Sequence, residues 1–312
     1  MKKIKFEQAV NEYLHISKLK LKPNSYRSME NRIKNNILPY FQKKYIHKID
    51  KREYIKWQLE IDKKDYSIRY KKNLHVCFVS FLNYCIKYYD LKVNVAQQVG
   101  NFKSSNYEVV GDIWEFDEFN KFISCVDDKV YNTFFKLLFY TGVRLGEALA
   151  LTYEDIDIIN NTIRINKNMT RFVNEKGEHI IVPPKTKKSI REIGIDNVMK
   201  NELLELNKYY SKNYDICNNK FYIFGGNKPL APTTIERKKN KYCDLANVKR
   251  IKIHEFRHSH ACLLFMNNVP ISEISQRLGH SSISMTTDIY LRFLPRQEKR
   301  VLATLNSLRL SA

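Results

Sequence analysis

Near the C-terminus, a histidine and a tyrosine lie ten residues apart in a stretch that could do chemistry. Gly279 predicts the end of one helix, and Ser281 and Ser282 can cap the next one. His280 would then occupy a tight turn, and Tyr290 would lie on the following helix. A proton-sharing group and a phenol would thus belong to one compact unit. Alternatively, His280 and Tyr290 are two unrelated surface residues. The chain contains 20 Tyr and 8 His, so this stretch alone does not favour a shared role.

In two further stretches, an arginine lies at the predicted end of a helix. Arg144 follows Gly142, which predicts a helix end, and Glu147 lies three residues later on the same helical face. Glu147 can therefore orient Arg144 or partly neutralise it. Further along, His254 and Arg257 share one face of another predicted helix. The alternative in each case is a solvated helix cap.

A lysine-rich turn is predicted between two strands, in the run from Pro183 to Arg191. Lys185, the lysine before Thr186, has a long side chain that can reach from this turn into a site. Lys187 and Lys188 are rivals for the same role.

Together these residue types suit the cleavage of a phosphodiester by a tyrosine. A phenol is a poor nucleophile at neutral pH because its pKa is about 10, and nearby cations favour the phenolate. Arginines can clamp the non-bridging oxygens, on which negative charge grows in the transition state. A lysine can give the departing 5′-oxygen its proton. This chemistry needs no metal or other cofactor, and the sequence has no obvious carboxylate cluster to hold a metal.

Two regions are expected to position these residues. Residues 1–98 carry apolar side chains at helical spacing and predict a bundle of four helices. Pro23 suits the first turn of the second helix, and Asp50 can cap the third. Residues 99–107 are small, polar and non-periodic, which predicts a linker. We therefore expect a helical domain over residues 1–106 and a second domain over residues 107–312.

The second domain is predicted to be mainly helical with a small antiparallel sheet, so the fold class is α+β. Its three strands are expected at residues 162–165, 178–182 and 189–195, with a turn at Lys176 and Gly177. Helices are expected at residues 115–126, 131–140, 144–151, 196–209, 232–246, 254–267 and 271–278. A last helix opening at Pro295 would carry one apolar face, formed by Val301, Leu302, Leu305 and Leu308.

The charge of the chain favours a polyanionic partner. The 312 residues include 54 Lys and Arg against 33 Asp and Glu, a formal charge of +21. Lysine and arginine release condensed counterions when they neutralise phosphates, so nucleic acid is the simplest partner. The alternative is an AT-rich genome, whose codons enrich lysine and asparagine. The 43% of hydrophobic residues indicates a globular protein.

The cysteines and the N-terminus predict a cytoplasmic protein. No signal peptide or run of 18 apolar residues is found, so no membrane association is expected. The cysteines form no C-x-x-C pair, and most of them are predicted to be small core residues with reduced thiols. They are Cys77, Cys85, Cys125, Cys217, Cys243 and Cys262.

On these four stretches, in this order, the chain resembles the tyrosine recombinase (phage integrase) family. The resemblance is closest to integrases of Gram-positive phages and conjugative elements, and it covers nearly the whole chain. It implies a site-specific recombinase that cuts and rejoins DNA through a covalent 3′-phosphotyrosine, and that integrates or excises a mobile element. The catalytic set that it implies is Arg144, Lys185, His254, Arg257, His280 and Tyr290.

The resemblance also implies a role for each of these residues. Arg144 and Arg257 would clamp the scissile phosphate with His254 beside them, and Lys185 would be the general acid. Glu147 falls where the family often has a supporting acid.

The resemblance also implies roles for the remaining two residues. His280 would hydrogen-bond the phosphate or share a proton with the nucleophile, and Tyr290 would form the covalent bond. The family fold implies two domains that close around DNA as a C-shaped clamp, and a C-terminal helix that docks on a neighbouring protomer. The expected partners are double-stranded core sites and three further copies in a homotetramer. A host bending protein or an excision factor is a further candidate.

One departure from the family concerns the N-terminus. Integrases of this kind often carry an arm-binding domain ahead of the core-binding helices, whereas here the helices begin near Phe6. We therefore expect a simpler recombinase that binds core sites only, or a shortened integrase.

Other functions compete with this interpretation. His254 and His258 match the H-E-x-x-H pattern of zinc proteases, but Ala261 stands where some of those enzymes have glycine. A zinc site would also leave the arginine, lysine and tyrosine candidates without a role. A non-catalytic DNA-binding protein would suit the charge but would need no phenol beside a phosphate clamp. A type IB topoisomerase shares the chemistry, and the six residues do not separate it from a recombinase.

Overall fold

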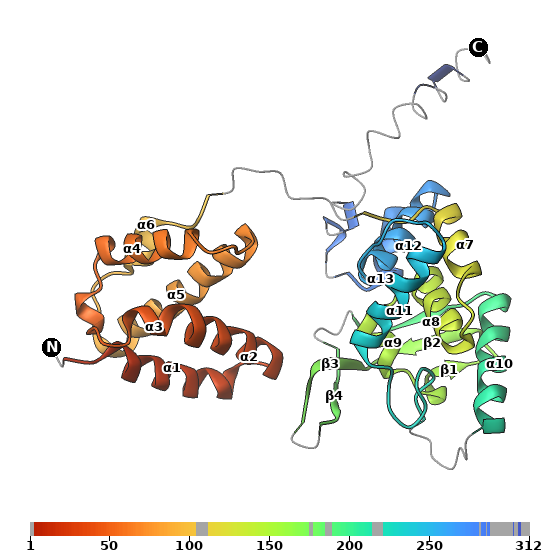
Figure 1. Cartoon of the computed structure of the whole chain (residues 1–312), viewed down its shortest axis with the longest axis horizontal. Helices are drawn as coiled ribbons and strands as arrows, with labels where there is room; N and C mark the ends of the chain where they lie inside the picture. Colours follow the sequence, from red (N-terminus) through yellow and green to blue (C-terminus); the bar gives the residue numbers. More distant parts are fainter. Residues whose placement is uncertain are drawn as a thin grey trace. The chain divides into compact units, whose positions relative to one another are not determined.

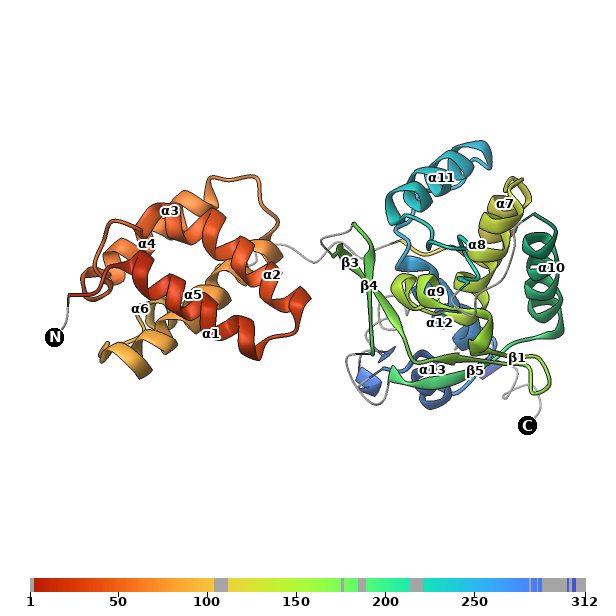
Figure 2. The same cartoon turned by 90° about the horizontal axis from the view of Figure 1, so that it is seen from below.

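The chain divides into two compact units, Met1–Glu108 and Val109–Ala312 (Figure 1). The computed structural model describes residues 3–103, 112–174, 177–184, 189–213, 221–280, 282–284, 286–287, 302 and 305–306. In these residues the elements of the first unit are helices, and the second unit combines helices with short strands (Figure 2). The predicted fold class, mainly helical with small antiparallel sheets, is confirmed.

The helices of the first unit begin where the sequence predicts. Pro23 lies in the first turn of its helix, and the Asp50 carboxylate accepts a hydrogen bond of 2.8 Å from the Glu53 amide. The elements are α1 Phe6–Lys20, α2 Pro23–Arg32, η1 Ile33–Ile37, α3 Leu38–Phe41, η2 Ile46–Lys48, α4 Lys51–Asp62, α5 Ile68–Tyr89 and α6 Val95–Val99.

A widened helical turn, the π-helix η1, interrupts the path from α2 to α3. Pro39 has no amide hydrogen and breaks the regular ladder just after this turn. The Asn36 carbonyl accepts a hydrogen bond of 2.8 Å from the Trp57 indole, and its side chain bonds the hydroxyls of Tyr66 and Tyr70. One buried amide thus ties the irregular turn to α4 and α5.

Aromatic side chains form the core of the first unit. Phe6, Phe41, Phe78 and Phe81 are almost fully buried, and Trp57 packs edge-on against Phe78 at 5.2 Å between ring centroids. Such pairs add to the free energy of burial because the ring edges face the electron-rich ring faces. Helices that are short individually are therefore held by one shared core.

The helices of the second unit follow the predicted pattern, with ends shifted by a few residues. Its elements up to the last strand are α7 Phe116–Ser124, α8 Lys129–Thr141, α9 Leu145–Ala150, η3 Tyr153–Asp155, β1 Ile156–Asp157, β2 Thr162–Ile165, β3 Asn168–Val173, β4 His179–Val182 and β5 Arg191–Gly194. The elements that follow are α10 Asn197–Asn213, α11 Pro232–Leu245, α12 Glu255–Met266 and α13 Ile271–Leu278.

The prediction of one three-stranded sheet from residues 162–165, 178–182 and 189–195 is wrong. The structure has a three-stranded sheet in the order β1-β2-β5 and a separate two-stranded hairpin of β3 and β4. The sequence of β3, Asn-Met-Thr-Arg-Phe-Val, lacks a clear apolar alternation, so periodicity did not reveal it. Gly177, with φ of +77°, lies in the turn of this hairpin, as predicted.

Helices α8 and α12 lie side by side in the middle of the second unit (Figure 1). Their buried faces carry Phe134, Phe135 and Phe256, which share one core with Trp114 of the preceding segment. The Trp114 indole donates a hydrogen bond of 2.9 Å to the Lys249 carbonyl. This core fixes the C-terminal end of α8 and the N-terminal end of α12.

Several predictions fall partly outside the described residues. Of the predicted last helix from Pro295, only residues 302, 305 and 306 are described. Of the predicted linker at residues 99–107, only 99–103 are described. Cys77, Cys85, Cys243 and Cys262 are buried, as predicted for core residues. Among the helices that are described, none is both long and apolar enough to cross a membrane.

Candidate functional site

The turn between α8 and α9 depends on a glycine. Gly142 ends α8 with φ of +66°, a left-handed conformation that a side chain disfavours. A Cβ atom at this position would lie 2.6 Å from His260 Cδ2 and 2.7 Å from a methyl carbon of Leu278. Gly142 is therefore required both by its backbone conformation and by the close approach of α12 and α13.

Arg257, which is 2% exposed, joins three elements from inside the protein. It lies in the first turn of α12 and donates one hydrogen bond of 2.8 Å to the Gly142 carbonyl. A second hydrogen bond goes to the Leu278 carbonyl at the end of α13. The guanidinium group is thus held where the ends of α8 and α13 meet.

Arg144 and Glu147 form the ion pair that the sequence predicts. The Arg144 amide and guanidinium donate hydrogen bonds of 3.0 and 2.8 Å to the two carboxylate oxygens of Glu147. The Glu147 side chain is 4% exposed, whereas that of Arg144 is 32% exposed and can still reach a ligand.

A second arginine that the sequence analysis did not select binds the same carboxylate. Arg191, at the start of β5, donates to both oxygens of Glu147 at 3.3 and 2.9 Å. Burial alone would raise the pKa of Glu147, but the hydrogen bonds and charge of Arg191, with the charge of Arg144, hold that pKa below its usual value. The carboxylate therefore stays ionised between two guanidinium groups.

The two predicted histidines lie beside these arginines. His280 follows Gly279, which ends α13 in the left-handed conformation as predicted, and its Nδ1 shares a hydrogen bond of 2.7 Å with the buried Thr286 hydroxyl. His254 is the N-cap residue of α12. The predicted cap residue Ser281 lies outside the described residues.

Both histidines are held in the neutral state. Burial, followed by the charges of Arg257 and Arg144, lowers the pKa of His280 to about 3. The same causes lower the pKa of His254, although part of its surface is exposed. A neutral imidazole can accept a proton and can also donate a hydrogen bond.

Among the described residues of the cluster, Arg144, Arg191 and Arg257 carry more positive charge than Glu147 balances. Burial, followed by the charge of Arg144, lowers the pKa of Arg257 to about 8, because a buried cation without a nearby balancing charge is unfavourable. An anion between Arg144 and Arg257 would remove that penalty. The arrangement is therefore suited to hold a phosphate.

The structure brings together four of the six candidate residues, Arg144, His254, Arg257 and His280. Lys185 and Tyr290 lie outside the described residues, as do the rival lysines at 187 and 188. The rings of His254 and His258, which match the zinc-protease pattern, are 5.0 Å apart. Among the residues that the structure describes, no group of three His, Cys, Asp or Glu could hold a metal ion.

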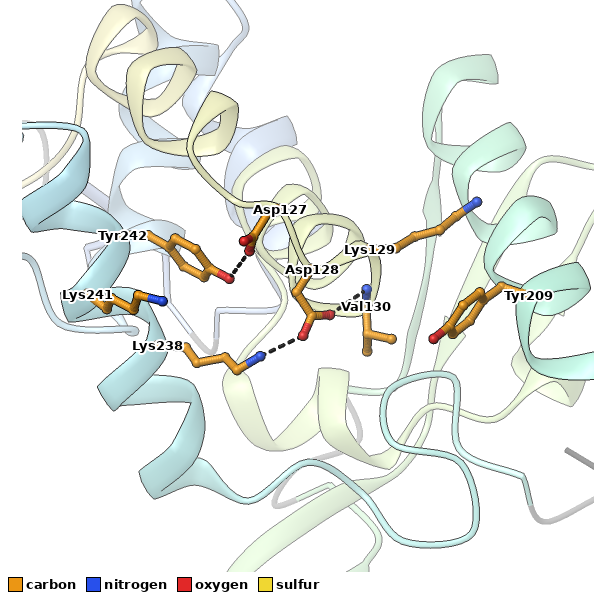
Figure 3. Close-up of a pocket in the computed structure, with 8 residues that line it drawn as sticks. All are labelled: Asp127, Asp128, Lys129, Val130, Tyr209, Lys238, Lys241 and Tyr242. Atoms are coloured by element: carbon orange, nitrogen blue, oxygen red, sulfur yellow. Dashed lines mark hydrogen bonds and ion pairs between the residues drawn. The ribbon is translucent and has the colours of Figure 1, made fainter. Parts of the chain in front are cut away.

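A pocket of about 630 Å³ lies elsewhere in the second unit, among α8, α10 and α11 (Figure 3). Three of its charged groups have partners within the pocket: Lys238 binds Asp128 at 2.5 Å, and Asp127 accepts a hydrogen bond of 2.6 Å from the Tyr242 hydroxyl. These contacts join α11 to the start of α8. We therefore assign this pocket a structural role rather than a chemical one.

Two models of known protein families match the chain. Residues 114–296 match the phage integrase family, and residues 5–61 match the N-terminal SAM-like domain of phage integrases. The chain belongs to the phage integrase family of site-specific tyrosine recombinases. The family, the recombinase class and the likeness to integrases of Gram-positive mobile elements, all predicted from the sequence, are confirmed.

Curated relatives are about a third identical to the chain over the residues that align. The ICEBs1 integrase of Bacillus subtilis (strain 168) is 29% identical over 316 residues, which cover 98% of this chain and 83% of that protein. A XerC-like tyrosine recombinase of Caldanaerobacter subterraneus is 34% identical over 194 residues. That match covers 56% of this chain and 48% of the relative.

Solved structures share the fold. The Tn1549 transposon integrase in complex with transposon right end DNA superposes with a TM-score of 0.72, at 20% identity, over 93% of this chain and 98% of that one. A lambda integrase tetramer bound to a Holliday junction gives 0.68 at 16% identity, over 92% of this chain and 78% of that one.

Proposed function

We propose that this recombinase cuts DNA with Tyr290, which forms a covalent 3′-phosphotyrosine, and that Arg144 and Arg257 hold the phosphate. The observation that carries the proposal is a pair of incompletely balanced guanidinium groups, Arg257 buried and Arg144 partly exposed, beside two neutral histidines. Paired N–H donors bind the non-bridging oxygens more strongly as negative charge grows on them, so this pair favours the transition state over the bound substrate.

The histidines would manage hydrogen bonds and protons around the phosphate. With Nδ1 of His280 engaged by Thr286, Nε2 is the atom that can face a phosphate oxygen or the attacking phenol. The low pKa of His280 keeps it neutral until a phosphate arrives, and the phosphate charge then raises that pKa. His280 could thus take up the phenolic proton only when a substrate is bound.

We assign the leaving-group proton to Lys185. This assignment is supported by the order of the motifs in the sequence and by the position of residues 183 and 184, which follow β4 in the same unit as the arginines. A lysine supplied from that side would protonate the 5′-oxygen as it leaves.

The two units would divide the work on DNA. Residues 1–106 would bind core-site DNA and residues 107–312 would carry out the chemistry, as the two family matches and the +21 charge of the chain support. Solved relatives are named as a dimer on a core site and a tetramer on a Holliday junction. We infer a homotetramer that integrates and excises a mobile element, with a host bending protein or an excision factor as further partners.

The decisive experiment traps the covalent intermediate. The protein is incubated with a nicked duplex from the end of the DNA element that encodes it, and SDS-resistant protein–DNA adducts are counted. Wild type and the control Tyr209→Phe should form the adduct, whereas Tyr290→Phe should form none and still bind the duplex. An adduct of unchanged yield in Tyr290→Phe would remove Tyr290 from this role.

A further inference from the structure

Arg191 has no role in the chemistry proposed above, yet it is almost fully buried in the site. Its side chain is 7% exposed, and it pairs with a Glu147 side chain that is 4% exposed. Burying a guanidinium group costs free energy unless all of its donors are used. Here Nη1 and Nη2 bind the two oxygens of Glu147, and Nε donates a hydrogen bond of 2.8 Å to the Arg277 carbonyl.

The contact with Arg277 ties Arg191 to the helix that leads to His280. The last carbonyls of a helix have no partner within the helix. In α13, Arg191 binds the carbonyl of Arg277 and Arg257 binds that of Leu278. Two cations therefore fix the C-terminal end of α13, where they also interact favourably with the helix dipole.

The second consequence concerns the charge of Arg144. If Glu147 had Arg144 as its single partner, the carboxylate would neutralise the guanidinium group that must attract a phosphate. Arg191 supplies a second positive charge to the same carboxylate, and this interaction is the strongest of those that hold the pKa of Glu147 down. Glu147 can then orient Arg144 while most of its negative charge is balanced elsewhere.

We propose that Arg191 is a positioning residue for strand cleavage, which balances Glu147 so that Arg144 stays available to the phosphate and which anchors the turn of His280. The proposal rests on the proposed function of Arg144 and His280. Arg191 lies on β5 and is not one of the six catalytic candidates.

The test uses single-turnover cleavage of the nicked duplex at saturating DNA, together with hydrogen–deuterium exchange of the free protein. The variants are Arg191→Gln, Arg191→Lys and the double variant Arg191→Gln with Glu147→Gln. Arg164→Gln is the matched control, because Arg164 is an exposed arginine on the neighbouring strand β2.

Arg191→Gln should slow cleavage about 100-fold, the order expected when a reacting group is misplaced by an ångström. DNA affinity should stay close to that of wild type. The cleavage rate of Arg191→Lys should lie between those of wild type and Arg191→Gln, because a lysine keeps the charge but lacks the planar fork of donors. In Arg191→Gln the amides of Arg144 and His280 should also exchange faster than in wild type and in Arg164→Gln.

The double variant gives the sharpest result. Removing the Glu147 charge as well frees Arg144, so the double variant should cleave about tenfold faster than Arg191→Gln alone. A merely structural role predicts that the second substitution slows cleavage further or leaves its rate unchanged, and either result would overturn the proposal. Exchange at Arg144 and His280 that matches the Arg164→Gln control would also overturn it.

The exchange measurement separates this proposal from the proposed function. If wild type formed no Tyr290-dependent adduct, the proposed function would fail. Faster exchange at Arg144 and His280 in Arg191→Gln would still support positioning by Arg191, because that measurement needs no cleavage.

Discussion

In the described part of the first unit, the buried polar side chains are Ser17, Asn36, His75 and Asn94, none of which is a carboxylate, a lysine or an arginine. The second unit buries Glu147, Asp155, Lys239 and Arg257. Both units have dense aromatic cores, so the difference does not come from a lack of apolar residues in the second unit.

The presence or absence of buried charge reflects the role of each unit. A buried charge destabilises a fold unless a partner compensates it, and a hydrophobic replacement is often equally stable. Lys239 and Asp155 have such partners, in Glu236 and Lys167. The arginine cluster is compensated incompletely, and we attribute the remaining charge to its proposed work on a phosphate.

The strongest predicted change follows from removing an aromatic ring from the uncharged core of the first unit. Phe78→Ala would leave a cavity among Phe6, Phe41 and Trp57 and should lower the free energy of unfolding of the first unit by about 3–5 kcal/mol. Hydrogen exchange should accelerate in α3 and α5 but not around Arg257. The control Val76→Ala, at an exposed position on the same helix, should change little. Equal loss of protection in both units would contradict the prediction that Phe78 stabilises only the first unit.

The next prediction concerns the charged cluster of the second unit. Arg257→Ala should slow adduct formation by about 10²–10³-fold, on the order of 3–4 kcal/mol of transition-state stabilisation. It should also expose the unpaired carbonyls of Gly142 and Leu278, so exchange should increase there while the first unit stays unchanged. Arg250→Ala, which removes a surface pair with Asp244, is the control and should leave the adduct rate unchanged. An Arg257→Ala rate near that of wild type would exclude a phosphate clamp.

The smallest effect is a pH dependence of stability. The pKa of His280 is lowered to about 3 in the folded protein, against about 6.5 in an unfolded chain. Between these values the unfolded chain binds more protons, so stability falls as pH falls below about 6.5. His254 and His260 shift in the same direction. Between pH 7 and pH 5, the melting temperature of His280→Asn should therefore fall less than that of wild type. An identical fall would show that His280 is not held neutral in the fold.

The sequence predicted those parts of the fold that local signals determine. Asp50 caps α4, and Gly142 and Gly279 end their helices, because these residues act on their immediate neighbours. The pairing of β4 with β3 was missed because β3 carries little periodic signal and its partner is set by tertiary contacts.

In the candidate site, too, only the residues that belong to local motifs could be predicted from the sequence. Arg144, His254, Arg257 and His280 were selected because each lies in a motif, and the structure brings them together. Arg191 looked like the end of a lysine-rich turn, and Thr286 like one of many hydroxyls. Their contacts with Glu147 and His280 depend on how β5 and residues 286–287 fold back on the site, which no local pattern in the sequence encodes.

The glycine between the helices has a consequence for genetics. Gly142 does no chemistry, but its left-handed backbone and the 2.6 Å approach of His260 leave no room for even a methyl group. A search for recombination-deficient alleles would therefore recover changes of this glycine alongside changes of the arginines. Such alleles would look catalytic in an excision assay, although their defect is in the packing and backbone conformation of the turn.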